Sequence, residues 1–340
     1  MKARVEPSYD TKRVKLSEVI PLDTPYTVFV EPTKACNFKC FYCMHSTKNT
    51  DNDIFKKEGY QIKHMDNDSF EKMIAQMKEF PRKFKRIVFS GLGEPLMNPN
   101  LPSMIRRVNE LNLAERVDIL TNASLLTPEL SNELVEAGVG RIQISLQGLN
   151  SEQYEKVAGV KIDYTNLVEN IRYLFENKKN TVIFIKIIDA LLEDENAEKL
   201  FYESFGSICD QIYIEHLITL QPQMGNHGGK ADDSRNLNNE IVEERKVCPV
   251  IFYMLQIDVD GNVFPCPVSG YPIKMRLGDI ENQTLLEVWN SVKRKNFLKM
   301  QLELKRHLIP ICGECKACAA VIDQNEMLDD VAGKIIKYFI

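Results

Sequence analysis

Hydrophobic and polar positions along the first two thirds of the chain predict β-strands separated by amphipathic helices. Apolar residues recur at helical spacing within 70–77, 101–111 and 167–175, and Asp68 and Thr127 are placed to cap two of the helices. Regular alternation of strand and helix predicts parallel strands with helical crossovers, that is, an α/β fold built as an open or closed barrel. The six predicted strands are short, apolar runs: Thr27–Val30, Arg86–Phe89, Val117–Leu120, Arg141–Leu146, Val182–Ile188 and Ile212–Leu217.

The pattern changes after about residue 222. Residues 224–240 are polar and glycine-rich, which favours a linker or lid. Beyond them, two apolar runs flank Asp260-Gly261, a strong hairpin signal, and 285–301 has a helical pattern. We therefore expect an N-terminal extension over 1–26, a core over 27–222, a linker or lid over 223–245, a small domain over 246–322 and a C-terminal helix over 323–340.

Composition excludes several classes of function. A net charge of −5 does not provide the basic face of a nucleic-acid-binding protein. The chain has no run of 18 apolar residues and no secretory signal, so we expect a cytoplasmic protein without a membrane partner. A reducing compartment does not favour disulfides, so the nine cysteines indicate metal or redox chemistry.

Cys36, Cys40 and Cys43 follow the first predicted strand directly, with the spacing Cys-x3-Cys-x2-Cys. Three thiolates on one short loop can hold three irons of a [4Fe–4S] cluster and leave the fourth iron open to a small chelating molecule. A structural zinc site completed by His45 is the alternative. The spacing alone favours the cluster but leaves both interpretations open.

Four motifs, taken in order, resemble the radical S-adenosylmethionine (SAM) superfamily. The cysteine loop matches the family's Cys-x3-Cys-x-aromatic-Cys pattern, with Tyr42 as the aromatic residue. SGLGEP at 90–95 is similar to the family's Gly-Gly-Glu element, TNA at 121–123 ends the third strand, and SLQG at 145–148 ends the fourth. Each motif lies at the carboxyl end of a strand, where the active sites of β/α barrels are found. The resemblance covers about residues 27–220 and implies a partial (β/α)6 TIM-like barrel.

The resemblance also implies a cofactor site and a reaction. A [4Fe–4S] cluster on the three cysteines would bind SAM, whose reductive cleavage gives methionine and a 5′-deoxyadenosyl radical that removes a hydrogen atom from the substrate. A reducing protein such as flavodoxin or ferredoxin would supply the electron. Lys186 and Ile218 each have an alternative to cofactor binding: Lys186 can be an exposed charge at a strand end, and Ile218 can be a plain core residue. The residues implied to contact the cofactor are Tyr42, Gly91, Gly93, Glu94, Asn122, Ser145, Gln147, Lys186 and Ile218.

The C-terminal cysteines resemble a SPASM/Twitch auxiliary-cluster domain. Cys248, twelve residues, Gly261, four residues and Cys266 match its Cys-x(9–15)-Gly-x4-Cys opening, and Cys312 and Cys315 follow as a Cys-x2-Cys pair. Four thiolates can close an auxiliary [4Fe–4S] cluster, with a zinc ribbon as the alternative. The run ends as Cys-x2-Cys-x2-Cys, which is too short for a second auxiliary cluster, so Cys318 is either an alternate ligand or a free thiol.

Three functions follow from this resemblance. One auxiliary cluster is typical of antibiotic aminocyclitol dehydrogenases, which favours oxidation or epimerisation of a sugar, aminocyclitol or related polyol. Peptide or protein modification, as by a RiPP or sulfatase-type maturase, is the second; we expect no leader-recognition domain, because 26 residues precede the first strand, so a small molecule is preferred over a peptide. The third is a non-enzymatic metal-binding scaffold.

Two residues at the end of the sixth strand are candidates for chemistry with the substrate. Glu215 and His216 lie at the correct face of the barrel, and neighbouring side chains on a strand point opposite ways, so one of them is expected to face the cavity. Either can serve as a base or a substrate ligand, with a solvated strand end as the alternative. Cys209 precedes the same strand and is expected to be a core thiol, away from the chemistry.

Overall fold

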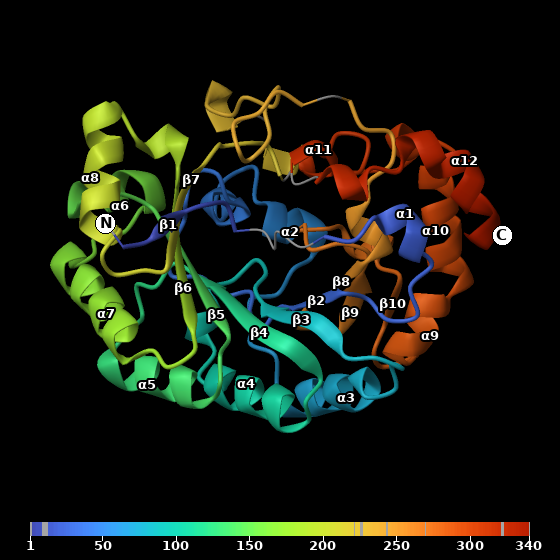
Figure 1. Ribbon diagram of the computed structural model, residues 1–340, viewed down its shortest axis with the longest axis horizontal. Helices are drawn as coiled ribbons and strands as arrows, with labels where there is room; N and C mark the ends of the chain where they lie inside the picture. Colours follow the sequence, from blue (N-terminus) through green and yellow to red (C-terminus); the bar gives the residue numbers. More distant parts are fainter. Residues whose placement is uncertain are drawn as a thin grey trace.

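The computed structural model describes residues 2–8, 13–220, 222–224, 227–242, 244–268, 270–320 and 323–339. Their strands form one ten-stranded sheet in the order β1-β7-β6-β5-β4-β3-β2-β8-β9-β10 (Figure 1). The six central strands are parallel and confirm the predicted α/β partial barrel. They are β2 (Thr27–Val30), β3 (Phe84–Phe89), β4 (Ala114–Thr121), β5 (Arg141–Leu146), β6 (Val182–Ile188) and β7 (Gln211–Glu215).

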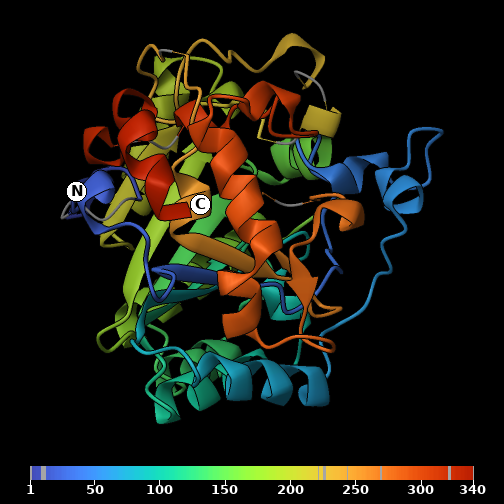
Figure 2. The ribbon, with the colours of Figure 1, turned by 90° about the vertical axis from the view of Figure 1, so that its right-hand side faces the viewer.

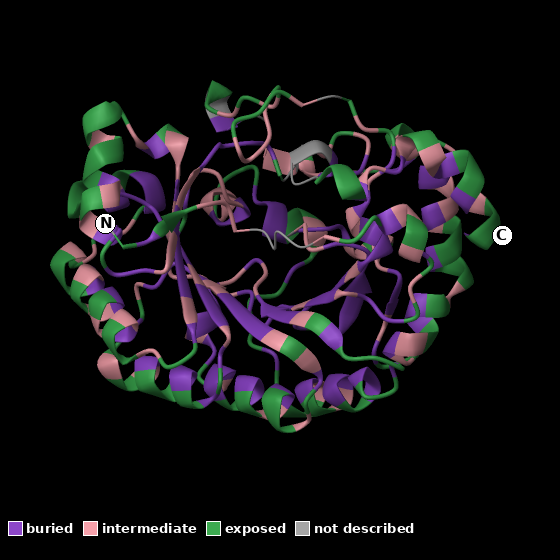
Figure 3. Cartoon of the chain, in the orientation of Figure 1, coloured by how far each residue is buried: buried purple, intermediate pink, exposed green. Residues whose placement is uncertain are grey.

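Helices cover the outer side of the curved sheet. Apolar strand residues such as Ile87 and Ile119 are completely buried against these helices, and their neighbours Arg86 and Asp118 line the inside of the barrel. Figure 3 shows the buried strands inside a shell of helices with exposed outer faces. This alternation gives the barrel an apolar outer surface and an interior that carries charged side chains among apolar ones. The covering helices are α3 (Asn67–Met77), α4 (Leu101–Glu110), α5 (Pro128–Glu136), α6 (Ser151–Ala158), α7 (Tyr164–Asn177) and α8 (Glu195–Phe205).

Helix ends follow the capping rules, with two differences from the sequence pattern. Thr127 caps α5 as predicted, but Asp66 rather than Asp68 caps α3, because Asp66 is extended and accepts a hydrogen bond from the Ser69 amide at 2.7 Å. The helix predicted over 285–301 is divided into α9 (Leu285–Asn290) and α10 (Val292–Leu302). Ser291 has an extended backbone and caps α10 with its hydroxyl, which ends the first helix and begins the second.

The small domain continues the barrel sheet, which the sequence pattern does not predict. Strand β8 (Met254–Ile257) pairs parallel with β2, and β9 (Asn262–Phe264) returns antiparallel to it. The predicted turn is confirmed, with Gly261 at a φ of 76°. The edge strands are β1 (Arg4–Val5), which pairs parallel with β7, and β10 (Gly278–Asp279), which pairs antiparallel with β9.

The segment around α1 packs against the C-terminal segment beside the small domain. Helix α1 (Leu16–Val19) contacts the turn at Gln324–Glu326, and α10 packs against α12 (Ala332–Ile335) (Figure 2). Where one C-terminal helix is expected over 323–340, the chain first makes that turn and then forms consecutive helical turns over residues 329–339. Two shorter helices, α2 (Ile54–Glu58) and α11 (Ala317–Ala320), complete the set. Among the described residues, no helix has the length and apolar character needed to cross a membrane.

Candidate functional site: two cysteine sets and a barrel cavity

The first cysteine set lies on the loop between β2 and α2. Cys40 is buried and Cys36 and Cys43 are partly exposed, and the backbone amide of Cys43 donates to the carbonyl of Cys40 at 2.8 Å. Burial, together with the nearby Glu94 and Cys43, raises the pKa of Cys36 to about 12. Thiols in such surroundings ionise when a metal supplies the compensating positive charge, so this donor set suits an iron–sulfur cluster.

One ring nitrogen of His45, the fourth ligand of the zinc alternative, is engaged by the glycine loop. Its Nε2 atom lies 2.9 Å from the carbonyl oxygen of Leu92, and its ring centroid lies 4.8 Å from that of Phe55. Burial lowers the pKa of His45 to about 4, so the ring is neutral near neutral pH. These contacts tie His45 to the glycine loop and favour the interpretation with three thiolates.

Gly91 and Gly93 allow the glycine loop to pack directly on the chain that leads into the cysteines. A Cβ atom on Gly93 would lie 2.2 Å from the carbonyl oxygen of Thr33, and one on Gly91 would lie 2.5 Å from Cγ of Glu31. The amide of Leu92 donates to the Glu31 carboxylate at 2.6 Å. The backbone of this loop is therefore held beside the cysteine loop, as its expected role in cofactor binding requires.

Glu94 holds the ends of β3 and β4 together. Its buried carboxylate accepts hydrogen bonds from the Thr121 hydroxyl at 2.5 Å, the Asn122 amide at 2.7 Å and the Leu96 amide at 3.1 Å. Burial raises the pKa of Glu94 to about 7, and these donors limit the rise. A role for this carboxylate as a partner of the cofactor's amino group stays a prediction, because that group would compete with three donors already in place.

Two of the expected polar contacts lie beside the cysteine loop. The Asn122 side chain donates a hydrogen bond to the Asn37 side chain at 3.0 Å. Asn37 lies within the cysteine loop and is not among the residues predicted from the sequence. Gln147 donates to the Tyr42 hydroxyl at 3.5 Å, and its Oε1 atom is buried without a hydrogen-bond partner among the described residues. A buried amide oxygen of this kind offers an acceptor to a bound molecule.

Lys186, Ser145 and Ile218 have different surroundings. Lys186 pairs with Ser145 across β5 and β6, and its Nζ atom lies 2.5 Å from a carboxylate oxygen of Glu215. The Lys186 side chain is 20% exposed, so it is an ion-paired group of the barrel interior rather than a solvated strand end. Ile218 is buried and does not line the cavity described next.

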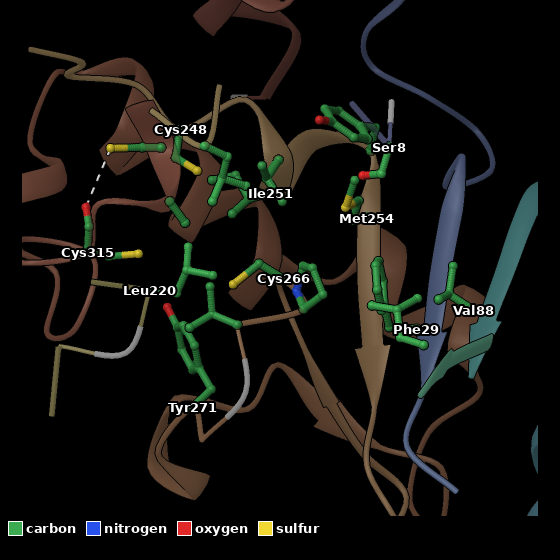
Figure 4. A pocket seen from close by; sticks show the side chains of 18 of the residues that line it. Ser8, Phe29, Val88, Leu220, Cys248, Ile251, Met254, Cys266, Tyr271 and Cys315 are labelled. Carbon is green, nitrogen blue, oxygen red and sulfur yellow. Dashed lines mark hydrogen bonds between the residues drawn. The ribbon is translucent and has the colours of Figure 1, made fainter. Parts of the chain in front are cut away.

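A cavity of about 330 Å³ runs from the inner faces of the strands to the C-terminal cysteines. Figure 4 shows Phe29 of β2 and Val88 of β3 on one side, with Cys248, Cys266 and Tyr271 on the other. The charged side chains that line the barrel part of the cavity are Arg86, Asp118, Arg141, Lys186 and Glu215. Glu215 therefore faces the cavity, as one of the two strand-end candidates was expected to do.

His216 faces away from this cavity. Its Nδ1 atom lies 2.5 Å from a carboxylate oxygen of Asp189, and its Nε2 atom lies 3.0 Å from the carbonyl oxygen of Asp232. Burial lowers the pKa of His216, but the Asp189 carboxylate and the Asp232 carbonyl outweigh it, so the net pKa is raised. The backbone amide of His216 also donates to the carbonyl of Leu237, so this residue fastens the predicted lid.

Five thiols gather at the far end of the cavity, namely Cys248, Cys266, Cys312, Cys315 and Cys318. Burial, together with the neighbouring Cys318 and Cys312, raises the pKa of Cys315 to about 12. Cys318 is buried, as are Cys266 and Cys312, and its Sγ atom lies 3.5 Å from the carbonyl oxygen of Cys315. In the described parts of the chain, no three His, Cys, Asp or Glu side chains lie close enough together to hold a single metal ion. A [4Fe–4S] cluster does not require this, because each thiolate binds a different iron.

Comparison with known protein families agrees with this geometry. Residues 30–200 match the family model of the radical SAM superfamily, and residues 248–318 match that of SPASM, an iron–sulfur cluster-binding domain. This chain belongs to the radical SAM superfamily. The radical SAM enzyme therefore uses a SAM-binding [4Fe–4S] cluster, an auxiliary cluster and SAM.

Curated relatives of this radical SAM enzyme include GTP 3′,8-cyclases. The probable GTP 3′,8-cyclase of Methanococcus aeolicus is 27% identical over 197 residues, which cover 50% of this chain and 61% of that protein. The GTP 3′,8-cyclase of Staphylococcus aureus is 27% identical over 170 residues, covering 50% and 48%. The chain thus spans about half the length of the curated relatives that it matches.

Solved structures share the fold of this radical SAM enzyme. BtrN in complex with AdoMet and 2-DOIA is 21% identical, with a TM-score of 0.53 over 85% of this chain and 92% of that chain. Streptococcus suis SuiB bound to S-adenosylmethionine is 15% identical, with a TM-score of 0.61 over 94% and 79%. The enzyme anSMEcpe with bound AdoMet is 19% identical, with a TM-score of 0.56 over 93% and 96%.

Proposed function

We propose that this radical SAM enzyme oxidises a small polyol, such as a sugar or aminocyclitol, inside the barrel cavity. The observation that carries this proposal is that one cavity of about 330 Å³ contains both the Lys186–Glu215 ion pair and the auxiliary thiols. That volume is at the small end of the range for ligand pockets, and the auxiliary cluster would take part of it, so the remaining space suits a single ring better than a peptide. BtrN, which shares the fold, was solved with 2-DOIA as well as AdoMet.

The bound cofactors supply a radical that removes hydrogen from carbon and, in the auxiliary cluster, an electron acceptor. A small reducing protein such as flavodoxin or ferredoxin delivers the starting electron. Cys36, Cys40 and Cys43 hold the first cluster, and four of the five C-terminal thiols hold the second. The glycine loop, Gln147 and Asn122 position SAM through their neutral hydrogen-bonding groups.

Glu215 and Lys186 handle the substrate's proton. Oxidation of a carbinol to a carbonyl removes a hydrogen atom from carbon, a proton from oxygen and one further electron. The Glu215 carboxylate accepts that proton, because it lines the cavity and is held in place by Lys186 at 2.5 Å. His216 cannot take this role from its position against Asp189 and the lid.

A first experiment tests the radical chemistry. Reconstituted wild-type protein is expected to bind two four-iron clusters, and changing Cys36, Cys40 and Cys43 together to alanine removes about half of the iron. The triple variant is also expected to lose SAM cleavage, measured as 5′-deoxyadenosine by chromatography. Continued cleavage in that variant would refute the assignment of the first cluster.

A second experiment identifies the substrate class. Reduced enzyme is incubated with SAM and candidate sugars, aminocyclitols or a peptide, each deuterated at carbon, and 5′-deoxyadenosine is analysed by mass spectrometry. Deuterium is expected from a polyol, and in a parallel reaction the unlabelled polyol is expected to give a product two mass units lighter than itself. Glu215→Gln should lower product formation by about 10²- to 10⁴-fold. His216→Gln is the control and should change it far less; transfer from the peptide alone would reject a polyol substrate.

Epimerisation is a second candidate because Cys318 lines the cavity while four other thiols suffice for a cluster. An epimerase returns a hydrogen atom to the opposite face of the substrate carbon, and a cysteine thiol is a suitable donor. Reaction in D2O separates the two outcomes, since epimerisation places solvent deuterium in a product of otherwise unchanged mass. Cys318→Ala should abolish that incorporation if Cys318 is the donor, and should leave oxidation intact if it is not.

A further inference from the structure

Tyr271 lies beside the auxiliary cysteines at the far end of the barrel cavity. The residue is 4% exposed and lines the cavity (Figure 4). Its hydroxyl oxygen lies 3.1 Å from Sγ of Cys312. Its backbone carbonyl accepts a hydrogen bond from the Tyr60 hydroxyl at 2.7 Å, and its ring packs on Phe264 with a centroid distance of 6.0 Å. The ring is thus fixed from two sides with its hydroxyl directed at one sulfur.

The direction of this hydrogen bond follows from the chemistry of a ligated thiolate. A cysteine sulfur bound to iron carries no proton and can only accept, and a phenol, which ionises near pH 10 in water, keeps its proton near neutral pH. Tyr271 therefore donates to Cys312 when the cluster is present.

A cation lies beside the same ligands. The Arg306 guanidinium donates to the backbone carbonyls of Cys312 and Cys315 and, at 3.1 Å, to that of Arg245. Burial raises the pKa of the Cys312 thiol, and the Tyr271 hydroxyl and this positive charge oppose the rise. Two features of the chain, a hydroxyl donor and a guanidinium, thus favour negative charge on this part of the sulfur set.

We propose that Tyr271 is a positioning residue for electron transfer, which raises the reduction potential of the auxiliary cluster through its hydrogen bond to Cys312. Reduction adds negative charge to a cluster and its thiolates, so a donor to a ligand sulfur stabilises the reduced state more than the oxidised state. A higher potential suits a cluster that receives an electron from the substrate. The inference deepens the proposed function and rests on it, because electron acceptance is the role proposed for this cluster.

The test is Tyr271→Phe, which removes only the hydroxyl and keeps the ring. The midpoint potential of the auxiliary cluster is measured by an anaerobic redox titration followed by EPR. The titration uses protein in which Cys36, Cys40 and Cys43 are alanine, so that only one cluster contributes. We expect the equilibrium constant for cluster reduction to fall about tenfold, which for a one-electron couple lowers the midpoint potential by about 59 mV. Iron content, measured in parallel, should stay at about four per chain.

Tyr253→Phe is the matched control. Tyr253 is buried and lines the same cavity, but its hydroxyl donates to the Glu326 carboxylate at 3.0 Å and not to a sulfur. Its removal should leave the potential unchanged. An unchanged potential in Tyr271→Phe, or an equal shift in both variants, would overturn the inference.

Failure of the inference and failure of the proposed function give different results. A lower potential in Tyr271→Phe, with no deuterium transfer from any polyol, would keep the tuning role and reject the substrate class. Polyol oxidation by the wild type, with an unchanged potential in Tyr271→Phe, would keep the substrate class and reject the tuning role. Loss of iron from Tyr271→Phe would instead make the residue structural and would also overturn the inference.

Discussion

Lys34 is a buried cation that joins the first cysteine loop to the small domain. The residue is 1% exposed, and its ammonium lies 2.9 Å from a carboxylate oxygen of Asp258 and 2.8 Å from one of Asp260. Glu31 lies 3.9 Å away and also binds the glycine loop through the Leu92 amide. Lys34→Met would leave the nearly fully buried carboxylates of Glu31 and Asp258 without this counter-charge.

Removing one partner of a buried ion pair costs about 3–5 kcal/mol of unfolding free energy. With about 2.1 cal/mol/K of unfolding entropy per residue, the 340-residue chain has about 0.7 kcal/mol/K in total, so Tm should fall by about 4–7 °C. Lys63→Met is the matched control, because Lys63 contacts the same Asp260 at 2.6 Å but its side chain is 42% exposed. Its loss should cost about 1 kcal/mol or less.

The effect of Lys34→Met should also depend on pH. Burial raises the pKa of Glu31 to about 7, and Lys34 holds it below a still higher value. Without the lysine, the folded state keeps a proton on Glu31 up to a pH at which the unfolded chain has already lost it. Lowering the pH from 8 to 6 therefore favours the folded variant, and the difference from the wild type should shrink. The assay is thermal unfolding of anaerobically reconstituted protein, followed by circular dichroism at one scan rate. Equal losses in the two lysine variants, or a difference that grows on acidification, would refute the reasoning.

Three further changes test other parts of the site. Gly93→Ala should prevent iron loading of the first cluster, measured as iron per chain, because its Cβ would lie 2.2 Å from the Thr33 carbonyl; Gly333→Ala, with nothing within 4 Å, should load normally. Cys209→Ala should keep full iron content but lower Tm by a few degrees, because Cys209 is a buried core thiol that donates to the Phe205 carbonyl. Glu94→Gln should reduce SAM binding in equilibrium dialysis, because the new side-chain amide places a donor against the backbone amide of Asn122 or Leu96. Retained affinity would show that SAM binding does not depend on these hydrogen bonds.

The barrel could be predicted from the sequence because its strands carry a strong local signal. Runs such as Val182–Ile188 are rich in β-branched residues, and the structure has a strand with those limits. The pairing of β8 with β2 could not be predicted in this way. Hairpin patterns specify a local turn, whereas the choice of a distant partner strand depends on packing between segments more than 200 residues apart in the chain.

The site residues that could be predicted are likewise those marked by local sequence features, and those that depend on tertiary contacts could not be predicted. Cysteine spacing and the glycine motif are local features, so the two thiol sets were recognisable from sequence. Glu215 and His216 were equal candidates, and only the tertiary contacts with Asp189 and the lid separate them. Asn37 and Tyr271 were missed because each is a single polar or aromatic residue within a loop, and its importance comes from a neighbour far away in sequence.

The end of β2 is where the two halves of the site are fixed to each other. Within five residues of this strand, Glu31 holds the glycine loop, Lys34 holds the turn of the small domain, and the cysteine loop begins. The same strand pairs with β3 on one side and with β8 on the other. A shift of the small domain would therefore pull on the cysteine loop through Lys34 and β2. The oxidation proposed above needs such a constraint, because the group that removes hydrogen and the group that takes the electron must both reach one bound substrate.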